Sequence, residues 1–333
     1  MSPVRRSTVY DVAREAGVAA STVSRAFSNP RRVNSVTREH VLNVAERLGY
    51  RPNPLASALQ SGRTATIALL VPDIANPHFF GTIRGAEGRA SASGITFILG
   101  YTEESADNER EQILRLDRSV DGFVLASSRM SDATTVELAR EHNLALVNRQ
   151  VGGLPSAIVD NGGGSRQIID HLASLGHRSV VYLSGPEQSW QAKERWKGLS
   201  SAAGRCGMAA TRLGPFSPRV AGGAAAADAA LVSGATAFVA HNDLLAIGML
   251  RRLAERGLRV PQDRSVVGYD DIFGADFCVP ALTTLAGPHE EAGRAGVELL
   301  LNRVSRATAG ESPRQVVLPA HLVVRDSTGP APD

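Results

Sequence analysis

The 333-residue chain lacks the features that mark several common classes of protein. Its only cysteines are Cys206 and Cys278, so the sequence holds neither a disulfide framework nor a CxxC pair for zinc. No uninterrupted apolar stretch approaches the ~20 residues of a membrane helix, and the polar residues after Arg6 do not resemble a signal peptide. We therefore expect a cytoplasmic protein that has no membrane partner.

Short motifs of familiar enzymes are also missing from the sequence. It contains no GxSxG nucleophile elbow and no HExxH zinc helix. Its many carboxylates show no pairing that marks an acid beside an ionised partner. The glycine run 162–164 lacks the Lys-Ser/Thr of a phosphate-binding P-loop, so a crossing between two lobes explains it better than a phosphate cradle. We expect a protein that is not an enzyme and needs no cofactor or metal.

Lysine is nearly absent, and arginine carries the positive charge. The whole chain has a net charge of +3, which by itself does not indicate nucleic acid. Residues 1–63 hold ten arginines against four acidic residues, a balance of +6, and the remainder holds 26 basic against 29 acidic residues, a balance of −3. A basic head on a mildly acidic body is typical of a nucleic-acid-binding module fused to another domain.

The first fifty residues predict three short helices. The first follows Thr8, a suitable N-cap, and Gly17 interrupts the apolar pattern before a second helix over 20–27. A third helix begins after Asn34 or Ser35. Two helices joined by a turn that contains glycine form a helix-turn-helix, and the alternative is a small helical domain that binds proteins. The polar helix face and the basic charge favour the former.

In a helix-turn-helix the early residues of the second helix contact base edges in the major groove. Here these residues are Ala20, Ser21 and Arg25. Arg25 can donate two hydrogen bonds to guanine, which is worth roughly 1–3 kcal/mol of discrimination between bases. The residues expected to contact phosphates, which position the protein without reading sequence, are Thr8, Thr22 and Ser24.

The segment 53–64 predicts a linker that contains one marginal helix. The prolines on both sides of Asn53 exclude a helix interior. The amphipathic stretch 55–60 is too short to be stably helical alone. It therefore either folds when it is docked on a partner or serves as a passive flexible linker.

From residue 65 onward, apolar runs alternate with segments of helix length. This alternation predicts a doubly wound α/β fold, and the number of runs exceeds one sheet of ordinary size. We expect two α/β lobes that divide near Asp160 and rejoin near 283–288. The expected strands are 66–71, 95–99, 122–125, 145–147, 157–159, 180–183, 237–240 and 265–267, and the expected helices are 80–92, 105–118, 164–175 and 243–256.

Polar clusters follow several of these strands, at the carboxyl ends where doubly wound folds bind ligands. Carboxylates and amides beside aromatic rings suit a polyhydroxylated ligand. The candidates at strand ends are Asp73, Asn76, Phe79, Asp160, Asn242 and Asp270. Structural roles are the alternative. Asp73 and Asp160 would then form turns or contacts between lobes, and Asp243 and Asp271 would cap helices. Trp196 would lie in the core, and His78 and His241 would be solvated or hydrogen-bonded loop residues.

Several stretches of the sequence match the motifs of one known protein family, in the same order along the chain. They are YDVAREAGVAASTVSRAFSNPRRVNSVTREHVLNVAERLGYRPNPLASALQSGRTATIALLVPDIANPHFF, VDNGGGSRQIIDHLASLGHRSVVYLSGP, HNDLLAIGML, RGLRVPQDRSVVGYDD, LTTLAGP and LPAHLVVRDS. Together they resemble the LacI/GalR family of repressors over nearly the whole chain. The resemblance implies a helix-turn-helix head and a periplasmic-binding-protein-like body of two lobes.

The same resemblance implies a homodimer whose paired heads read a roughly palindromic operator in double-stranded DNA. It also implies that the linker folds into a hinge helix on DNA, where Leu59 wedges into the minor groove beside Ala56. Asn53 completes the expected DNA-binding set. Three positions depart from the family pattern. Ala19 is expected to remove one phosphate contact, and Ser57 and Gln60 in the hinge are expected to weaken the affinity for the DNA backbone.

In the body the resemblance implies an effector site between the lobes. Arg195 occupies the position of the family's effector-binding arginine, Asn242 that of its amide and Asp270 that of its carboxylate. Gln191 aligns with a pocket position, and Trp190 is well placed to line the cleft. A sugar or sugar derivative is favoured as the effector over a purine nucleobase.

The predicted organisation joins these parts. The head covers 1–52, the hinge 53–64 and the body 65–333; lobe 1 takes about 65–160 and 288–318, and lobe 2 about 161–287 and 319–326. The tail has no apolar heptads for a tetramerising coiled coil, so we expect a dimer. We expect a transcriptional repressor in which effector binding changes the angle between the lobes. The alternative is a sugar-binding module or sugar-active enzyme fused to a DNA-binding head.

Overall fold

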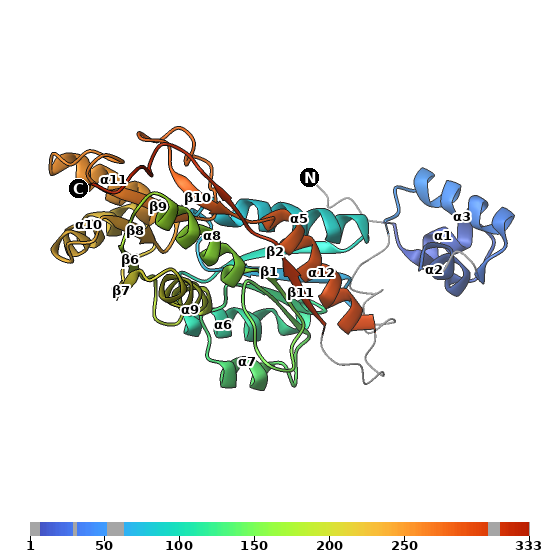
Figure 1. Cartoon of the computed structure of the whole chain (residues 1–333). Helices are drawn as coiled ribbons and strands as arrows, with labels where there is room; N and C mark the ends of the chain where they lie inside the picture. Colours follow the sequence, from blue (N-terminus) through green and yellow to red (C-terminus); the bar gives the residue numbers. More distant parts are fainter. Residues whose placement is uncertain (1–6, 29–31, 52–62, 306–313, 333) are drawn as a thin grey trace. The chain divides into compact units, whose positions relative to one another are not determined.

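The computed structural model describes residues 7–28, 32–51, 63–305 and 314–332, and the chain divides into two compact units, Met1–Ala65 and Thr66–Asp333 (Figure 1). The smaller unit contains the helices α1 (Val9–Glu15), α2 (Ala20–Ser28) and α3 (Ser35–Arg47). None of the described helices is both long and apolar enough to cross a membrane. Each unit is described separately below.

Local hydrogen bonds fix the helix ends in the smaller unit. Thr8 caps α1: its hydroxyl accepts the amide of Asp11, while the Asp11 carboxylate accepts the amide of Thr8. Asn34, the first of the two predicted caps, accepts the amide of Val36 at 2.9 Å and begins α3. Gly17 follows α1 with a φ of 64°, a left-handed conformation that glycine adopts at little cost.

The three helices of the smaller unit enclose one small core. Val12, Val23 and Val41, one from each helix, are fully buried. Phe27 packs edge-on against Tyr50, with ring centroids 5.8 Å apart. This packing confirms the predicted helix-turn-helix and leaves the opposite face of α2 exposed to solvent.

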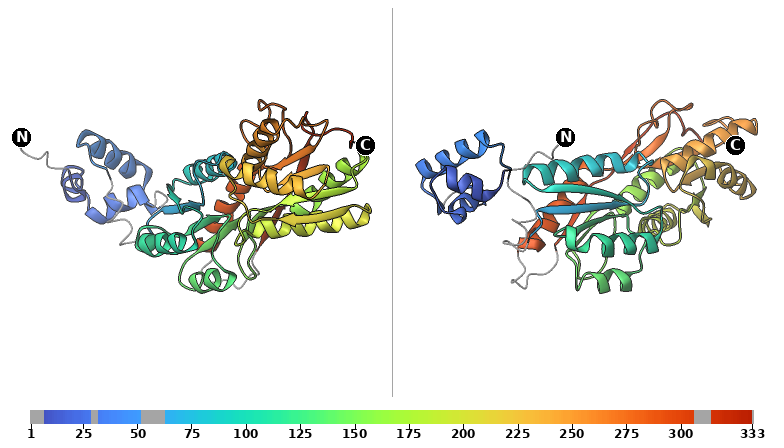
Figure 2. Two further views of the ribbon diagram at one scale, coloured as in Figure 1. Left: turned by 90° about the vertical axis from the view of Figure 1, so that its left-hand side faces the viewer. Right: turned by 180° about the vertical axis from the view of Figure 1, so that it is seen from behind.

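The larger unit contains two six-stranded sheets (Figures 1 and 2). We call the part built on the first sheet lobe 1 and the part built on the second sheet lobe 2. In strand order, the first sheet consists of β11 (Gln315–Leu318), β5 (Ser156–Val159), β4 (Leu144–Val147), β3 (Phe123–Ala126), β1 (Thr66–Val71) and β2 (Thr96–Tyr101), and every described pair in it is parallel. This is the predicted doubly wound arrangement.

Lobe 2 repeats that strand order, but one of its edge strands runs antiparallel to its neighbour. Its sheet consists of β12 (His321–Val323), β10 (Thr283–Ala286), β9 (Ser265–Tyr269), β8 (Ala237–Ala240), β6 (Ser179–Leu183) and β7 (Ala209–Leu213). The β10–β12 pair is antiparallel, and the other pairs are parallel. The chain crosses between the sheets after β5, after β10 and between β11 and β12, so the two lobes predicted from the sequence are confirmed, while the predicted domain bounds stay predictions.

Helices cover both faces of each sheet. In lobe 1, α5 (His78–Ala92) and α12 (His289–Ser305) pack on one face, and α6 (Ala106–Leu116) and α7 (Asp132–Leu138) pack on the other. In lobe 2, α10 (Gly223–Val232) and α11 (Asp243–Glu255) lie opposite α8 (Asn161–Ser174) and α9 (Trp190–Arg205). Short 3₁₀ turns cover Asp117–Ser119 and Val220–Gly222. Alternate residues of β1 enter the two cores of lobe 1, as a strand buried on both faces requires.

The two helices on one face of lobe 1 are in backbone contact. A Cβ atom added at Gly85 of α5 would collide with the carbonyl oxygen of Glu290, and one added at Gly293 of α12 would collide with that of Thr82. These two glycines therefore allow α5 and α12 to approach more closely than helices with side chains at the crossing can.

Most expected elements differ from those observed by a residue or two, and three of the helices differ by two or more residues at one end. The helix expected over 80–92 begins two residues earlier, because Asn76 accepts the amide of His78 at 3.0 Å. The helix expected from 164 begins at Asn161, because Asp160 caps it and the glycine run forms its first turn. The helix expected over 105–118 ends at Leu116 and gives way to a 3₁₀ turn.

Candidate functional site

The exposed face of α2 carries the residues predicted to read DNA. Ser21 and Arg25 lie one helical turn apart and are exposed, while Ala20, Thr22 and Ser24 are half-buried. The hydroxyl of Thr8 donates to Asp11 at 2.7 Å, so in the free protein it serves the α1 cap. Asn53, Ala56 and Leu59 lie outside the described residues. The DNA contacts of all these residues stay predictions.

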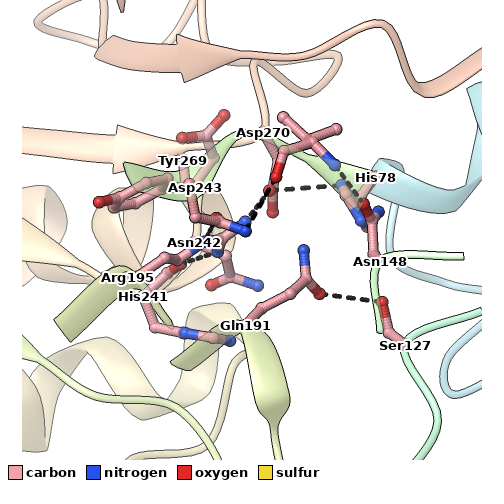
Figure 3. Close-up of polar contacts among 12 residues, drawn as sticks. His78, Ser127, Asn148, Gln191, Arg195, His241, Asn242, Asp243, Tyr269 and Asp270 are labelled. Carbon is pink, nitrogen blue, oxygen red and sulfur yellow. Dashed lines mark hydrogen bonds and ion pairs between the residues drawn. The ribbon is translucent and has the colours of Figure 1, made fainter. Parts of the chain in front are cut away.

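In the larger unit, a buried ion pair lies where the two lobes meet (Figure 3). Asp270 follows β9, and Arg195 points toward it from α9 with its Nη2 atom 2.7 Å from Oδ1; each side chain is only 5% exposed. The Arg195 Nε atom donates to Asn161 at 3.2 Å, and its guanidinium also donates to the carbonyl oxygen of His241. The guanidinium carbon lies 4.2 Å from the ring centre of Tyr269. Lobe 2 alone therefore fixes the orientation of both charges.

The electrostatics of this pair follow from its burial. Burial raises the pKa of Asp270, but the neighbouring His78 imidazole and Arg195 guanidinium lower it by more, so the net shift is downward. Burial lowers the pKa of His78 to about 3, although the Asp270 carboxylate raises it. At neutral pH the site therefore holds an ionised carboxylate, a guanidinium and a neutral imidazole.

A second carboxylate supports the loop that carries Asp270. Asp243 is fully buried, and it accepts hydrogen bonds from Thr284 at 2.6 Å and from the amide of Ile272 at 2.9 Å. Burial raises the pKa of Asp243 well above its usual range. The residue is not the helix cap considered from the sequence, because Asn242 caps α11.

Side-chain contacts cross from lobe 1 to lobe 2 at this site. Ser127, which follows β3, donates to Gln191 of α9 at 2.9 Å. His78 Nδ1 lies 3.4 Å from Asp270 Oδ1. Farther along the boundary, Asp73 pairs with Arg219 at 2.9 Å, which is the lobe-to-lobe contact considered for Asp73. Gln191, Asp270 and Arg195 thus lie in one region of the boundary (Figure 3), and their effector contacts stay predictions.

The remaining predicted residues have visible structural roles. Asp160 caps α8, and Asn242 caps α11 while donating to the carbonyl oxygen of Pro218 at 2.9 Å. Phe79 is 3% exposed in the lobe 1 core, and Trp190 begins α9 half-buried. Asn76 accepts the amide of His78. Their effector contacts stay predictions.

Several side chains at the site were not selected from the sequence. Ser127 and Asn148 are the first residues after β3 and β4, so the strand-end rule that selected Asp270 applies to them as well (Figure 3). His241 is buried in the loop after β8 and hydrogen-bonded to Tyr182 at 3.1 Å, which is the hydrogen-bonded loop role considered for it, whereas His78 is buried in the first turn of α5. No local pattern indicates this burial, because distant elements produce it.

Trp196 lies in the core, which is the structural role considered for it from the sequence. Its ring stacks on Tyr182 with a centroid distance of 6.3 Å and an interplanar angle of 11°. The residue packs against the cluster formed by α8, α9 and the lobe 2 sheet.

The comparisons with known proteins agree with this geometry. A model described as bacterial regulatory proteins of the lacI family matches residues 8–53, and one described as a periplasmic binding protein-like domain matches residues 169–328. The HTH-type transcriptional repressor CytR of Escherichia coli strain K12 is 32% identical over 334 residues, which cover 98% of this chain and 97% of CytR.

Solved structures extend the likeness to three dimensions. The Lac repressor dimer bound to operator and the anti-inducer ONPF is 27% identical, with a TM-score of 0.84 over 98% of this chain and 100% of that one. The complex of the transcriptional regulator CelR with cellobiose is 31% identical, with a TM-score of 0.71 over 97% of this chain and 100% of that one. The chain therefore belongs to the LacI family of bacterial transcriptional regulators.

Proposed function

We propose that this regulator is a sequence-specific repressor whose effector, a sugar or sugar derivative, binds between the lobes beside Arg195 and Asp270. The observation that carries the proposal is the buried Arg195–Asp270 pair at the lobe boundary. A carboxylate can accept hydrogen bonds from two neighbouring hydroxyls, while a guanidinium donates to hydroxyl or ring oxygens. The likeness to the CelR–cellobiose complex supports this class of ligand.

The switch would operate through the contacts between the lobes. Ser127 with Gln191 and His78 with Asp270 join lobe 1 to lobe 2 through individual side chains. An effector that binds one lobe arrangement better than another shifts the population toward it by its difference in affinity. That shift would change the spacing of two heads in a dimer, and with it the fit to operator half-sites.

An exposed apolar surface supports a homodimer, the form in which the Lac repressor structure is described. Phe273, Phe277 and Val279 are 79%, 63% and 92% exposed, and the two phenylalanine rings lie 5.1 Å apart. Phe273 and Phe80 line one cavity, so the surface continues onto α5. Large exposed apolar surfaces of this kind mark protein–protein contacts.

The dimer is tested by sedimentation velocity. Val279→Asp should convert the wild-type dimer to monomer, because it places a charge in the contact. Val232→Asp is the matched control, since Val232 is 88% exposed on α10 and is not among the residues of this surface. A dimer that survives Val279→Asp, or a wild-type monomer at micromolar concentration, would contradict the proposal.

DNA recognition is tested by selecting bound sequences from a random DNA pool with the full-length protein. The wild type should enrich a roughly palindromic site. Arg25→Ala should lose preference at one position of each half-site, worth roughly 1–3 kcal/mol. A selection that enriches no sequence would refute sequence-specific binding.

Effector binding is then tested by fluorescence anisotropy of the selected DNA against sugars and nucleosides. A sugar should change the affinity of the wild type, and Gln191→Ala and Asp270→Asn should lose that response. Asp170→Asn is the charge-matched control and should keep it, because Asp170 is exposed on α8. A response to nucleosides alone would replace the sugar class, and turnover of a sugar would restore the enzyme alternative.

A further inference from the structure

Two histidines and one carboxylate meet beside the ion pair described above. His78 is the first residue of α5, His289 is the first residue of α12, and Asp270 follows β9. The rings of His78 and His289 have centroids 4.3 Å apart. One potential ligand atom from each of the three residues lies within 4.8 Å of the others.

Buried nitrogen atoms in this cluster have no hydrogen-bond partner among the described residues. His78 is 4% exposed, and neither of its ring nitrogens forms a hydrogen bond, although Nδ1 lies 3.4 Å from Asp270 Oδ1. His289 Nδ1 is also buried without a partner, while its Nε2 lies 3.2 Å from the carbonyl oxygen of Asp270. An unsatisfied buried polar group costs about 1–3 kcal/mol, so three in one place point to a missing ligand.

The chemistry of the cluster suits a transition metal ion. Two imidazoles and a carboxylate are the donor set of many zinc sites, which leave a fourth position for water. Two ligands each 2.0–2.1 Å from a tetrahedral zinc ion stand roughly 3.3 Å apart, which is close to the 3.4 Å between His78 and Asp270.

A solvent-accessible cavity leads to the cluster. It has a volume of about 390 Å³, and its lining includes all three residues together with Phe80, Arg84 and Phe273. In a single chain an ion can therefore reach the two histidines without unfolding of the lobe, although Phe80 and Phe273 also belong to the surface proposed for the dimer. The cavity also has room for the water that an open zinc site retains.

We propose that His78, Asp270 and His289 bind a divalent transition metal ion, with zinc the favoured ion. Arg195 remains beside the site, since its Nη2 atom donates to Asp270 Oδ1, and its charge weakens the affinity for a cation. Asp270 belongs to lobe 2, whereas both histidines begin helices of lobe 1, so a bound ion ties the lobes together. Metal and effector share Asp270, and each therefore changes the affinity for the other by the same factor.

The test uses full-length protein stripped with a chelator and titrated with Zn²⁺ by calorimetry at pH 7.5. The wild type should bind one ion per chain. His289→Gln and His78→Gln should each weaken binding by at least about tenfold, as the loss of a metal-supporting group does. His321→Gln is the matched control, because His321 is exposed on β12, and it should bind as the wild type does.

Two further measurements need no variant. Co²⁺ in place of zinc should give the visible absorption bands of a tetrahedral ion. Anomalous diffraction from zinc-soaked wild-type crystals should place the ion among the three side chains. Absence of binding at 0.1 mM free zinc (roughly 5 kcal/mol of affinity), unchanged affinity of folded His289→Gln, or an ion located elsewhere would overturn the proposal. None of these results depends on whether the effector is a sugar.

Discussion

The two lobes share a strand order but hold their polar side chains at the boundary in different ways. In lobe 2, Arg195 and Asp270 are bound to each other and to further groups of the same lobe, so the charged surface is complete before anything binds. In lobe 1, Ser127 and His78 reach across as individual side chains. Lobe 2 thus presents a preorganised surface, and lobe 1 contacts it through single side chains whose hydrogen bonds a ligand could replace.

In contrast to the ion pair of lobe 2, the buried arginines of lobe 1 pair with acidic residues that are not part of the candidate site. Arg129 and Arg149 are buried at the ends of β3 and β4, but each is paired within lobe 1, with Glu104 and Asp132 respectively. Glu109 is buried there as well, and it accepts hydrogen bonds from Ser128 and from the Arg129 amide at 3.0 Å. These pairs stabilise the lobe, so beside the Arg195–Asp270 pair lobe 1 contributes the neutral groups Ser127 and His78, while its charged Asp73 meets Arg219 farther along the boundary. The following predictions test that contrast, from the largest expected effect to the smallest.

Arg195→Ala should lower the free energy of unfolding most. It leaves the Asp270 carboxylate buried without its guanidinium partner, and breaking a buried ion pair from one side costs about 3–5 kcal/mol. Arg251→Ala is the control, because Arg251 is exposed and pairs with Glu255 at the helix surface, worth about 0.3–0.5 kcal/mol. Urea unfolding measures both. Equal losses would show that lobe 2 is not organised around its buried pair.

Gly293→Ala should destabilise lobe 1 by about 1–3 kcal/mol, the usual cost of overpacking. The added methyl group would collide with the carbonyl oxygen of Thr82 and force α12 away from α5. Gly88→Ala on α5 is the control, since its Cβ would meet no atom within 4 Å and alanine favours a helix by roughly 0.5–1 kcal/mol. Opposite signs in thermal unfolding are the expected result, and the same sign would contradict close helix contact.

Ser127→Ala should have a smaller effect, near 1 kcal/mol, the net worth of one hydrogen bond. It removes the contact from lobe 1 to Gln191 without disturbing the Arg195–Asp270 pair. We expect the effector affinity to change more than the melting temperature, because the bond joins lobes and supports neither core. Anisotropy with the effector and calorimetry of unfolding separate the two. A change in melting temperature alone would assign Ser127 to stability.

The smallest effect concerns pH and His177, which lies in lobe 2 away from the boundary. Burial lowers the pKa of His177 below its ordinary value, and its ring bonds Thr236 at 2.8 Å and Ser265 at 2.9 Å. The unfolded chain therefore takes up a proton at a higher pH than the folded protein does. The stability from this residue is complete above about pH 6.5 and declines as the pH falls below it.

Unfolding at pH 7.5 and 5.5 tests this sign. The loss of stability between the two pH values should be smaller in His177→Gln than in the wild type. His321→Gln should keep the full loss, because His321 is exposed. A loss of stability that is unchanged in His177→Gln would assign the pH dependence to other groups.

Among the strands, the sequence predicted the apolar runs and missed strands whose residues are exposed or polar. The strand expected over 66–71 is observed with the same limits. In contrast, β7 was missed because it is an edge strand that places Arg212 in solvent. β10 was missed because its buried threonines are satisfied by hydrogen bonds to Arg325 and Asp243, which no local pattern reveals.

The residues of the candidate site likewise include some that the sequence predicts and others that it misses. Asp270 was found because it follows a strand, and the fold brings the ends of parallel strands together. His289 was not found, because its place beside His78 depends on the close contact of α5 with α12, two helices that lie far apart in the chain. Periodicity reports which face of a helix is buried, but it does not report which side chains from distant elements share that burial.

The contact of α5 with α12 has a mechanical consequence. Helices that pack through side chains can slide as rotamers change, but these two touch through the backbone at Gly85 and Gly293. We expect them to move together, so that a displacement of His78 by a ligand also shifts the far end of α5, 15 residues or about 22 Å away. The absence of a side chain at Gly85 and at Gly293 would thus link the lobe boundary to the far end of lobe 1.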